Sequence, residues 1–476
     1  MRSRLPTGRF SRSARLAGLA GRTVVNRAET RVGRRFGGER AQAAERARQA
    51  RLAERYRRVM GDMKGATMKA GQILSFVDMD ALIPASQRDM FQSALTGLQD
   101  DVPPLALEEI SGVIHSELGA PPERLFAFFS AEPVAAASIG QVHLARLGDG
   151  TEVAVKVQYP GVAEAVRADL ANTELFAGAI GTALRFLGPR APRIDPRVLA
   201  EEIRDRVTDE LDYRLEAASQ ETFHALYEGH PYIHVPRVYG ELSTGRVLVS
   251  DYVHGQRWTS AITAPPDVRS RWGEGIFRFV YTSLYRHGLF NADPHPGNFL
   301  FHEDGGVTFL DFGSVQRFDD EQLKAMSALL DATFASSATD VTRALKCLGM
   351  LSGDDASALD HERLLDFYRA VLADRVSPQP FTFTPQWAGE IVAHTYQPLG
   401  PWYDVTRRLR MPKQLLYLNR ILIGASSVLG HLYATADWRA IDHEIRHGGP
   451  PATSLGRAEA NWRARRMDSQ GVRETA

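Results

Sequence analysis

The chain has 476 residues, 44% of them hydrophobic and 24% charged, with a formal net charge of zero. These values are typical of a globular protein with two or three domains. Its one cysteine, Cys347, excludes an internal disulfide and favours a reducing compartment. We interpret Cys347 as a buried core thiol rather than a nucleophile.

The charge is unevenly distributed. Residues 1–60 hold 17 arginines and 4 glutamates, a local excess of +13. No run in this arm is apolar enough for a signal peptide or a spanning helix. We expect a partly flexible tail that could meet an anionic membrane surface. Nucleic acid is not an expected partner, because only Phe10 and Phe36 interleave the arginines.

Helices are predicted over residues 40–60, in glycine-interrupted pieces over Met60–Ser75, and over Pro103–Gly119. "QVHLARL", "GDG" and "TEVAVKVQYP" then predict a β-hairpin. The later predictions are a long helix (Val198–Tyr227), a strand (Arg246–Val253), a helix (Gly273–Phe290), and helices from Phe318 to about Ile445. The apolar stretch Gln414–Tyr433 contains Asn419, Arg420 and His431, so it is predicted to be a buried helix rather than a membrane span.

This order favours an α+β fold in which a small strand-rich lobe precedes a larger helical lobe, with a nucleotide in the cleft between them. The predicted divisions are an arm (1–55), a helical extension (56–133), a small lobe (134–258), a helical lobe (259–445) and a polar, loose tail (446–476).

The stretch "NADPHPGNFLFHEDGGVTFLDFG" (Asn291–Gly313) sets two aspartates and an asparagine among apolar residues. Its two short strands and "EDGG" turn bring Asn298 and Asp311 together. Mg²⁺ prefers such hard oxygen ligands together with phosphate oxygens, so these two residues are the predicted metal ligands. Asp293 would then lie beside the γ-phosphate, as an acceptor for a hydroxyl proton or as an orienting charge. The D-x-x-x-x-N spacing followed by D-F-G has the order of the protein-kinase signature.

Only six of the 57 basic residues are lysines, and Lys156 lies in "TEVAVKVQYP", between valines on a predicted strand. A compact ammonium group at this position resembles the strand lysine of protein kinases, which holds the α- and β-phosphates. Its predicted helix partner is Glu216, which "DELDYRLEAAS" places on one helix face with Asp212. Two such carboxylates, with Glu210 nearby, need cations between them.

Where a protein kinase has a glycine-rich loop, this chain has "AAASIGQVH". Its backbone N–H groups could still approach phosphates. The predicted nucleotide-binding residues of this loop are Ala135, Ala136, Ala137, Ser138, Ile139, Gly140, Gln141 and Val142.

Four stretches together resemble the UbiB/AarF family of atypical kinases: "KAGQ" (Lys69–Gln72), "AAASIGQVH", "ELDYRLE" (Glu210–Glu216) and "NADPHPGN…DFG". The resemblance covers roughly Tyr56 to Ile445. It implies a bilobal protein-kinase-like fold that binds Mg²⁺ and ATP or ADP, and a link to isoprenoid lipids, chiefly ubiquinone.

The resemblance also implies site roles. Lys156 pairs with Glu216 and contacts phosphate, Asn298 and Asp311 bind magnesium, and Asp293 is the acid of the catalytic loop. The helical extension is implied to fold over the cleft, so that Lys69, near Gln72, meets Glu210 and Asp212.

One departure concerns the C-terminal end. UbiB ends in membrane-spanning segments, whereas this chain ends in "RAEANWRARRMDSQGVRETA", so we expect a cytoplasmic protein, peripheral at the inner face of the membrane. Two alternatives remain open. One is a nucleotide-gated scaffold or lipid-binding protein with little phosphotransfer, and the other is a small-molecule kinase of the aminoglycoside or choline phosphotransferase type.

Overall fold

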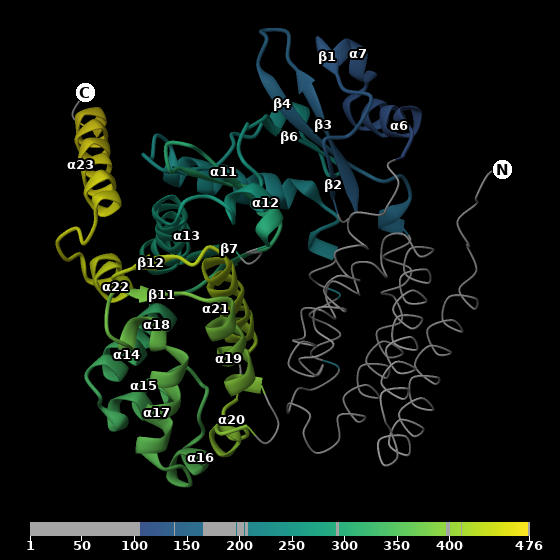
Figure 1. The fold of residues 1–476 in the computed structure, drawn as a ribbon. Coiled ribbons are helices and arrows are strands. Elements are labelled where there is room, and N and C mark those ends of the chain that lie inside the picture. The colour runs from purple at the N-terminus through teal and green to yellow at the C-terminus, as the bar shows by residue number, and fades with distance from the viewer. Residues whose placement is uncertain are drawn as a thin grey trace, which may run out of the picture. The chain divides into compact units, whose positions relative to one another are not determined.

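The computed structural model describes residues 105–137, 139–164, 197, 204, 208–291, 295–396, 400–410 and 412–474 (Figure 1). The chain divides into two compact units, Met1–Pro103 and Pro104–Ala476. The arm, most of the predicted extension, Lys69 and Gln72 belong to the first unit and lie outside the described residues. Ser138 and Asp293, in the second unit, also lie outside them.

The small lobe is an antiparallel sheet covered on one face by helices (Figure 1). Its strands are β1 (Phe128–Phe129), β2 (Ala135–Ala137), β3 (Gly140–Arg146), β4 (Glu152–Gln158) and β6 (Val247–Asp251). They run in the order β1-β3-β4-β6, and β2 pairs with β3. The predicted hairpin and the predicted strand near residue 250 are confirmed.

Helices α6 (Leu107–Leu118) and α7 (Pro122–Leu125) belong to this lobe. Val153 and Val155, alternate residues of β4, have no exposed surface and pack in one cluster with Ile110 and Ile114 of α6. Gly119, in the left-handed region with φ of 75°, ends α6 as predicted. The predicted boundary at residue 134 therefore falls inside one continuous core.

The helix predicted over Val198–Tyr227 is not continuous: residues 204, 208 and 209 are helical, but a turn at residues 210–211 interrupts it. The structure has α11 (Tyr213–Tyr227), and Glu210 lies in a turn before it. Asp212 is the N-cap residue, with extended backbone, and its side chain accepts a hydrogen bond from the backbone N–H of Arg214 at 3.1 Å. A helix begins after such a cap, so Asp212 and Glu216 do not share one helix face.

The large lobe surrounds α13 (Pro266–His287), in which every residue from Trp272 to Leu284 is buried. Gly288 ends this helix in the left-handed region, so Leu289 and Phe290 form strand β7 rather than extending the predicted helix. The short strands here are β5 (Ile233–His234), β7 (Leu289–Asn291), β8 (Phe299–Phe301), β9 (Val307–Phe309), β10 (Val315–Arg317), β11 (Phe381–Thr382) and β12 (Thr435–Ala436).

Helices beyond Phe318 are confirmed as the predominant structure. They are α14 (Asp320–Phe334), α15 (Ala338–Cys347), α16 (Gly353–Ser357), α17 (His361–Val371), α18 (Ala373–Val376), α19 (Pro385–Tyr396), α20 (Tyr403–Thr406), α21 (Lys413–His431) and α22 (Trp438–His447); η2 (Gly240–Leu242), α12 (Trp258–Ala261) and η3 (Pro296–Asn298) precede them. Helix α21 confirms the predicted apolar helix and buries Leu415, Val428 and Leu429. None of the described helices has both the length and the apolar character needed to cross a membrane.

Cys347 is exposed, so the prediction of a buried core thiol is wrong. Helix α15 turns a different face inward, with Val341 and Leu345 fully buried. The apolar residues around Cys347 in the sequence are spaced to bury that face, which leaves the thiol on the other side of the helix.

The C-terminal segment predicted to be loose is a helix, α23 (Ser454–Glu474). Leu455 and Glu459 on it are buried, and Tyr232 donates a hydrogen bond from its hydroxyl to Glu459 at 2.9 Å. The helix has no broad apolar stripe, and its docking depends on a few buried contacts.

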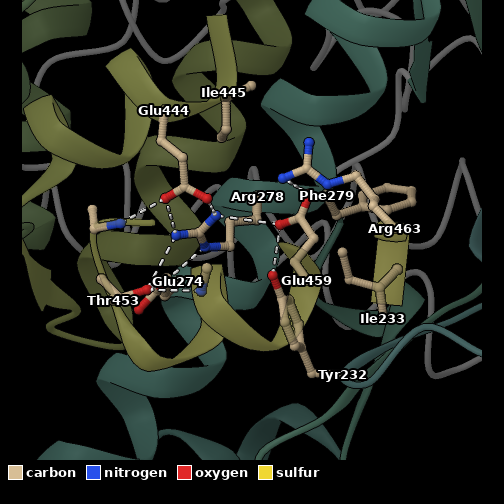
Figure 2. A network of polar contacts seen from close by, with 12 residues as sticks. Tyr232, Ile233, Glu274, Arg278, Phe279, Glu444, Ile445, Thr453, Glu459 and Arg463 are labelled. Carbon is tan, nitrogen blue, oxygen red and sulfur yellow. Dashed lines mark hydrogen bonds and ion pairs between the residues drawn. The ribbon is translucent and has the colours of Figure 1, made fainter. Parts of the chain in front are cut away.

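A buried ionic network fastens α23 to the large lobe (Figure 2). Arg278, on α13, has no exposed side-chain surface. Its guanidinium donates to Glu274 at 2.7 Å, to Glu444 at 2.9 Å and 3.0 Å, and to Glu459 at 3.2 Å. Three separate segments, α13, α22 and α23, therefore converge on one cation.

We expect Arg278→Met to lower the free energy of unfolding by about 3–5 kcal/mol, because it leaves buried carboxylates without their cation. Chemical denaturation would measure the loss. The matched control is Arg343→Met, which removes an ion pair whose side chains are 69% and 48% exposed and should change stability by about 1 kcal/mol or less. Equal effects of the two substitutions would contradict this prediction.

Candidate active site

An ion pair between strand β4 and helix α11 forms the centre of the site. Lys156 Nζ donates to both carboxylate oxygens of Glu216, at 2.6 Å and 2.8 Å. Both side chains are largely buried, with 18% and 8% of their surface exposed. The predicted pairing of Lys156 with Glu216 is present in the structure.

Two further groups surround the Lys156 ammonium. Asp311 Oδ2 lies 3.8 Å from Nζ, and the ring of Tyr213 lies 5.0 Å from it. Burial alone lowers the pKa of Lys156, but the negative charges of Glu216 and Asp311 outweigh burial and hold that pKa above its ordinary value. Lys156 is therefore a cation at neutral pH. Tyr213 is a neighbour that the sequence motifs did not indicate.

Glu216 depends on this cation. Burial, together with the negative charge of Asp311, raises the pKa of Glu216 to about 7, even though Lys156 lowers it. A carboxyl group in this setting would lose its charge readily without the lysine. Removing Lys156 therefore removes the main reason for Glu216 to stay ionised.

Asp311 has an unusual backbone conformation. It follows β9 with φ of 61°, in the left-handed region that few residues other than glycine, asparagine and aspartate adopt. Asn291 donates from its side chain to the Asp311 carbonyl at 3.0 Å, and the Gly313 N–H donates to Asp311 Oδ1 at 3.1 Å. The first contact holds the backbone of Asp311, and the second fixes the direction of its carboxylate. Asn291 is a second contributor for which the sequence had given no role.

Asn298 ends η3 directly before β8, and Asp311 follows β9, so the β8–β9 hairpin brings the two residues close together, as predicted. The Leu310 N–H donates to the Asn298 carbonyl at 2.9 Å, so the backbone of Asn298 is one residue from Asp311 across the strands. A carboxylate and a carboxamide are hard oxygen donors, the kind that Mg²⁺ takes beside phosphate oxygens. The donor set therefore fits magnesium, with Asp311 and Asn298 as the two residues that would hold it.

The D-F-G phenylalanine packs on the helix that carries Glu216. Phe312 has no exposed surface, and its ring centroid lies 5.0 Å from that of Phe223 on α11. The residue after Asp311 thus packs against α11, so the position of α11 and the position of Asp311 depend on each other.

The alanine-rich segment forms a tight antiparallel pair. Ala137 is opposite Gly140, Ala136 opposite Gln141 and Ala135 opposite Val142. A side chain at Gly140 would place its Cβ 2.2 Å from the carbonyl oxygen of Val157. Only glycine allows strands β3 and β4 to approach this closely.

The side chains of Gln141 and Ile139 are buried, and their predicted contact with nucleotide, which depends on backbone N–H groups, stays a prediction. Ile139 is 3% exposed and Gln141 is 1% exposed. Gln141 Oε1 accepts a hydrogen bond from the Leu105 N–H at 3.0 Å. Its other amide atom lies 2.9 Å from His143 Nε2, and His143 Nδ1 lies 2.8 Å from the Ser130 carbonyl. Gln141 is opposite Val157, whose side chain faces α6, whereas Val142 is opposite Lys156. The side chain of Val142 therefore lies on the same face of the sheet as Lys156.

The predicted roles of Asp293, Ser138, Lys69 and Gln72 lie outside the described residues and stay predictions. Asp212 is placed as a helix cap and Glu210 in the turn before it. Their predicted meeting with Lys69 is likewise a prediction.

The small antiparallel lobe, the strand lysine paired with a helix glutamate, and Asp311 after a short hairpin define a protein-kinase-like fold. Residues 97–345, more than half of the chain, match the ABC1 atypical kinase-like domain. The chain belongs to this family of atypical kinases, which confirms the resemblance to UbiB/AarF proteins.

Relatives and a solved structure agree with this assignment. Atypical kinase COQ8B, mitochondrial, of Rattus norvegicus is 30% identical over 401 residues, covering 83% of this chain and 72% of that protein. Protein ACTIVITY OF BC1 COMPLEX KINASE 1, chloroplastic, of Arabidopsis thaliana is 33% identical over 311 residues, covering 63% of this chain and 43% of that protein. An uncharacterised protein of Mycobacterium tuberculosis is 33% identical over 315 residues, and the match spans 62% of its length. The structure of Rv3197 from Mycobacterium tuberculosis, in complex with erythromycin, has a TM-score of 0.61 at 29% identity, covering 87% of this chain and 100% of that one.

We expect Gly140→Ala to destabilise the protein by about 1–3 kcal/mol, because the new Cβ forces β3 and β4 apart. Thermal and chemical unfolding would measure the change. Gly148→Ala is the matched control, since a Cβ at Gly148 meets nothing within 4 Å, and it should stay within about 0.5 kcal/mol of the wild type. A Gly140→Ala protein as stable as this control would show that the close approach is unimportant.

Proposed function

We propose that this protein binds magnesium and ATP between its two lobes and transfers or hydrolyses the γ-phosphate. The observation that carries the proposal is the Lys156–Glu216 pair with Asp311 at 3.8 Å from the lysine. The protonated Lys156 can contact a polyphosphate, and the partly exposed carboxylate of Asp311 can bind the cation that accompanies it.

Each residue then has a distinct role. Lys156 would contact the α- and β-phosphates, and Glu216 would hold its ammonium in place. Asp311 and Asn298 would hold magnesium, which, when bound, neutralises phosphate charge and orients the transferred group. Asp293 would accept a proton from the attacking hydroxyl or water, or orient it. The backbone of the alanine-rich segment would lie along the phosphates.

We propose a setting at the inner, cytoplasmic face of a membrane, in isoprenoid-lipid or quinone metabolism. Family membership supports the lipid link, because members of the UbiB/AarF family are linked to such lipids. The arginine excess of residues 1–60 supports an anionic surface as a partner. The phosphoryl acceptor would be a lipid or water, and turnover decides between an enzyme and a nucleotide-gated scaffold.

We expect Lys156→Met and Asp311→Asn each to weaken magnesium-dependent ATP binding by about ten- to a hundredfold. Each removes a charge-assisted contact, which is typically worth about 1.5–3 kcal/mol. Calorimetric titration with ATP, with and without Mg²⁺, would measure the affinity. Lys324→Met is the matched control, since Lys324 is exposed on α14. Wild-type affinity in both site variants would reject the site assignment.

Turnover is tested separately by phosphate release from Mg-ATP, with and without liposomes that contain anionic lipid. We expect release that liposomes stimulate and that Asp311→Asn removes. Stimulation by neutral liposomes to the same extent would reject the anionic surface. Tight nucleotide binding without release in any condition would favour the scaffold instead.

A further inference from the structure

The C-terminal helix contacts the end of the helix that carries Glu216. Arg466, on α23, donates from its guanidinium to the carbonyl oxygens of Ala225 and Leu226, the latter at 3.2 Å. Trp462 Nε1, one turn earlier on α23, donates to the Glu228 carbonyl at 3.1 Å. All three carbonyls belong to the last turn of α11 or to the residue that follows it.

These contacts supply what a helix end lacks. The last four carbonyls of an α-helix have no partner within the helix, and they carry the negative end of its dipole. A guanidinium is well suited to them, because it is always charged and presents several donors in one plane. Arg466 and Trp462 therefore act together as a cap that the C-terminal segment provides to α11.

Helix α23 is itself firmly attached to the large lobe. Glu459 lies one turn before Trp462 and joins the buried network of Arg278 (Figure 2). The indole of Trp462 also meets the edge of His230, with ring centroids 4.5 Å apart. The cap on α11 is thus anchored to the large lobe through α23.

The N-terminal end of α11 faces the site. Glu216 lies nine residues before Ala225, which corresponds to about 14 Å along a helix that rises 1.5 Å per residue. A short, hydrogen-bonded helix moves as a unit, so a shift at its C-terminal end displaces Glu216 from Lys156. The Lys156 ammonium contacts both oxygens of Glu216 at 2.6 Å and 2.8 Å, so a displacement of about one ångström breaks this geometry.

We propose that α23 is a clamp that positions α11, and that Arg466 and Trp462 are positioning residues for the Lys156–Glu216 pair. The link from the clamp to nucleotide rests on the proposed function, whereas the link from the clamp to α11 does not. Without the clamp, α11 samples positions in which the pair is open. The apparent affinity for nucleotide is then reduced in proportion to the fraction of molecules in which the pair is closed. Saturating nucleotide restores the closed pair.

Two measurements on the full chain test the clamp, with Arg466→Met as the variant and Arg465→Met as the matched control. Arg465 is exposed on the same turn of α23. Hydrogen exchange of residues 213–227 reports the position of α11 without any nucleotide. Titration with Mg-ATP, in the wild type and in a Glu216→Gln background, reports the coupling between the clamp and the ion pair.

We expect Arg466→Met to speed exchange throughout α11, including its first turn at Glu216. It should raise the apparent Kd for Mg-ATP about three- to tenfold, leave kcat at saturation near the wild-type value, and add nothing in the Glu216→Gln background. Arg466→Lys should recover part of the affinity, and Arg465→Met should match the wild type.

The opposing outcomes are distinct. Faster exchange confined to the last turn of α11, or an equal loss of affinity in the Glu216→Gln background, would show that Arg466 only stabilises the end of a helix. Failure of the wild type to bind Mg-ATP would reject the proposed function. In that case the exchange of the first turn alone still decides whether the clamp exists.

Discussion

The ion pair between Lys156 and Glu216 joins elements that belong to two hydrophobic cores. Lys156 lies on β4, whose Val155 and Val157 are buried in the core of the small lobe. Glu216 lies on α11, whose Phe223 and Tyr227 are buried in the core of the large lobe. Because an opened buried pair leaves charges without compensation, this contact ties the relative position of strand and helix to the state of the site.

The backbone around the site is constrained at two points. Asp311 adopts positive φ, and Asn291 and Gly313 hold it there through hydrogen bonds. Gly140 lies against the Val157 carbonyl, where no side chain fits. Residues in sparsely populated backbone regions often occur at functional sites, where the surrounding structure holds them in place. The first constraint directs the Asp311 carboxylate toward Lys156, and the second holds β4 close to β3, the strand that pairs with the alanine-rich β2.

Much of the site could be predicted because its signals are local in the sequence. The alternating residues of β3 and β4, the lysine between valines and the hairpin before "DFG" each depend on neighbours a few residues away. Two features that were not predicted depend on contacts between distant segments. The orientation of the Gln141 side chain depends on its hydrogen bond with the Leu105 N–H, 36 residues earlier. The helix α23 is stabilised by Arg278 and Tyr232, far from it in the chain. The break at Asp212 was a local signal that could have been found, since aspartate is a common N-cap.

The most direct test of the central claim is a crystal structure of the full chain with Mg²⁺ and a non-hydrolysable ATP analogue. The proposed site predicts a phosphate oxygen within hydrogen-bond distance of Lys156 Nζ, with the Lys156–Glu216 contact retained. It also predicts a magnesium ion coordinated by Asp311 and Asn298. A nucleotide bound elsewhere, or phosphates that approach neither Lys156 nor Asp311, would contradict the assignment of this site.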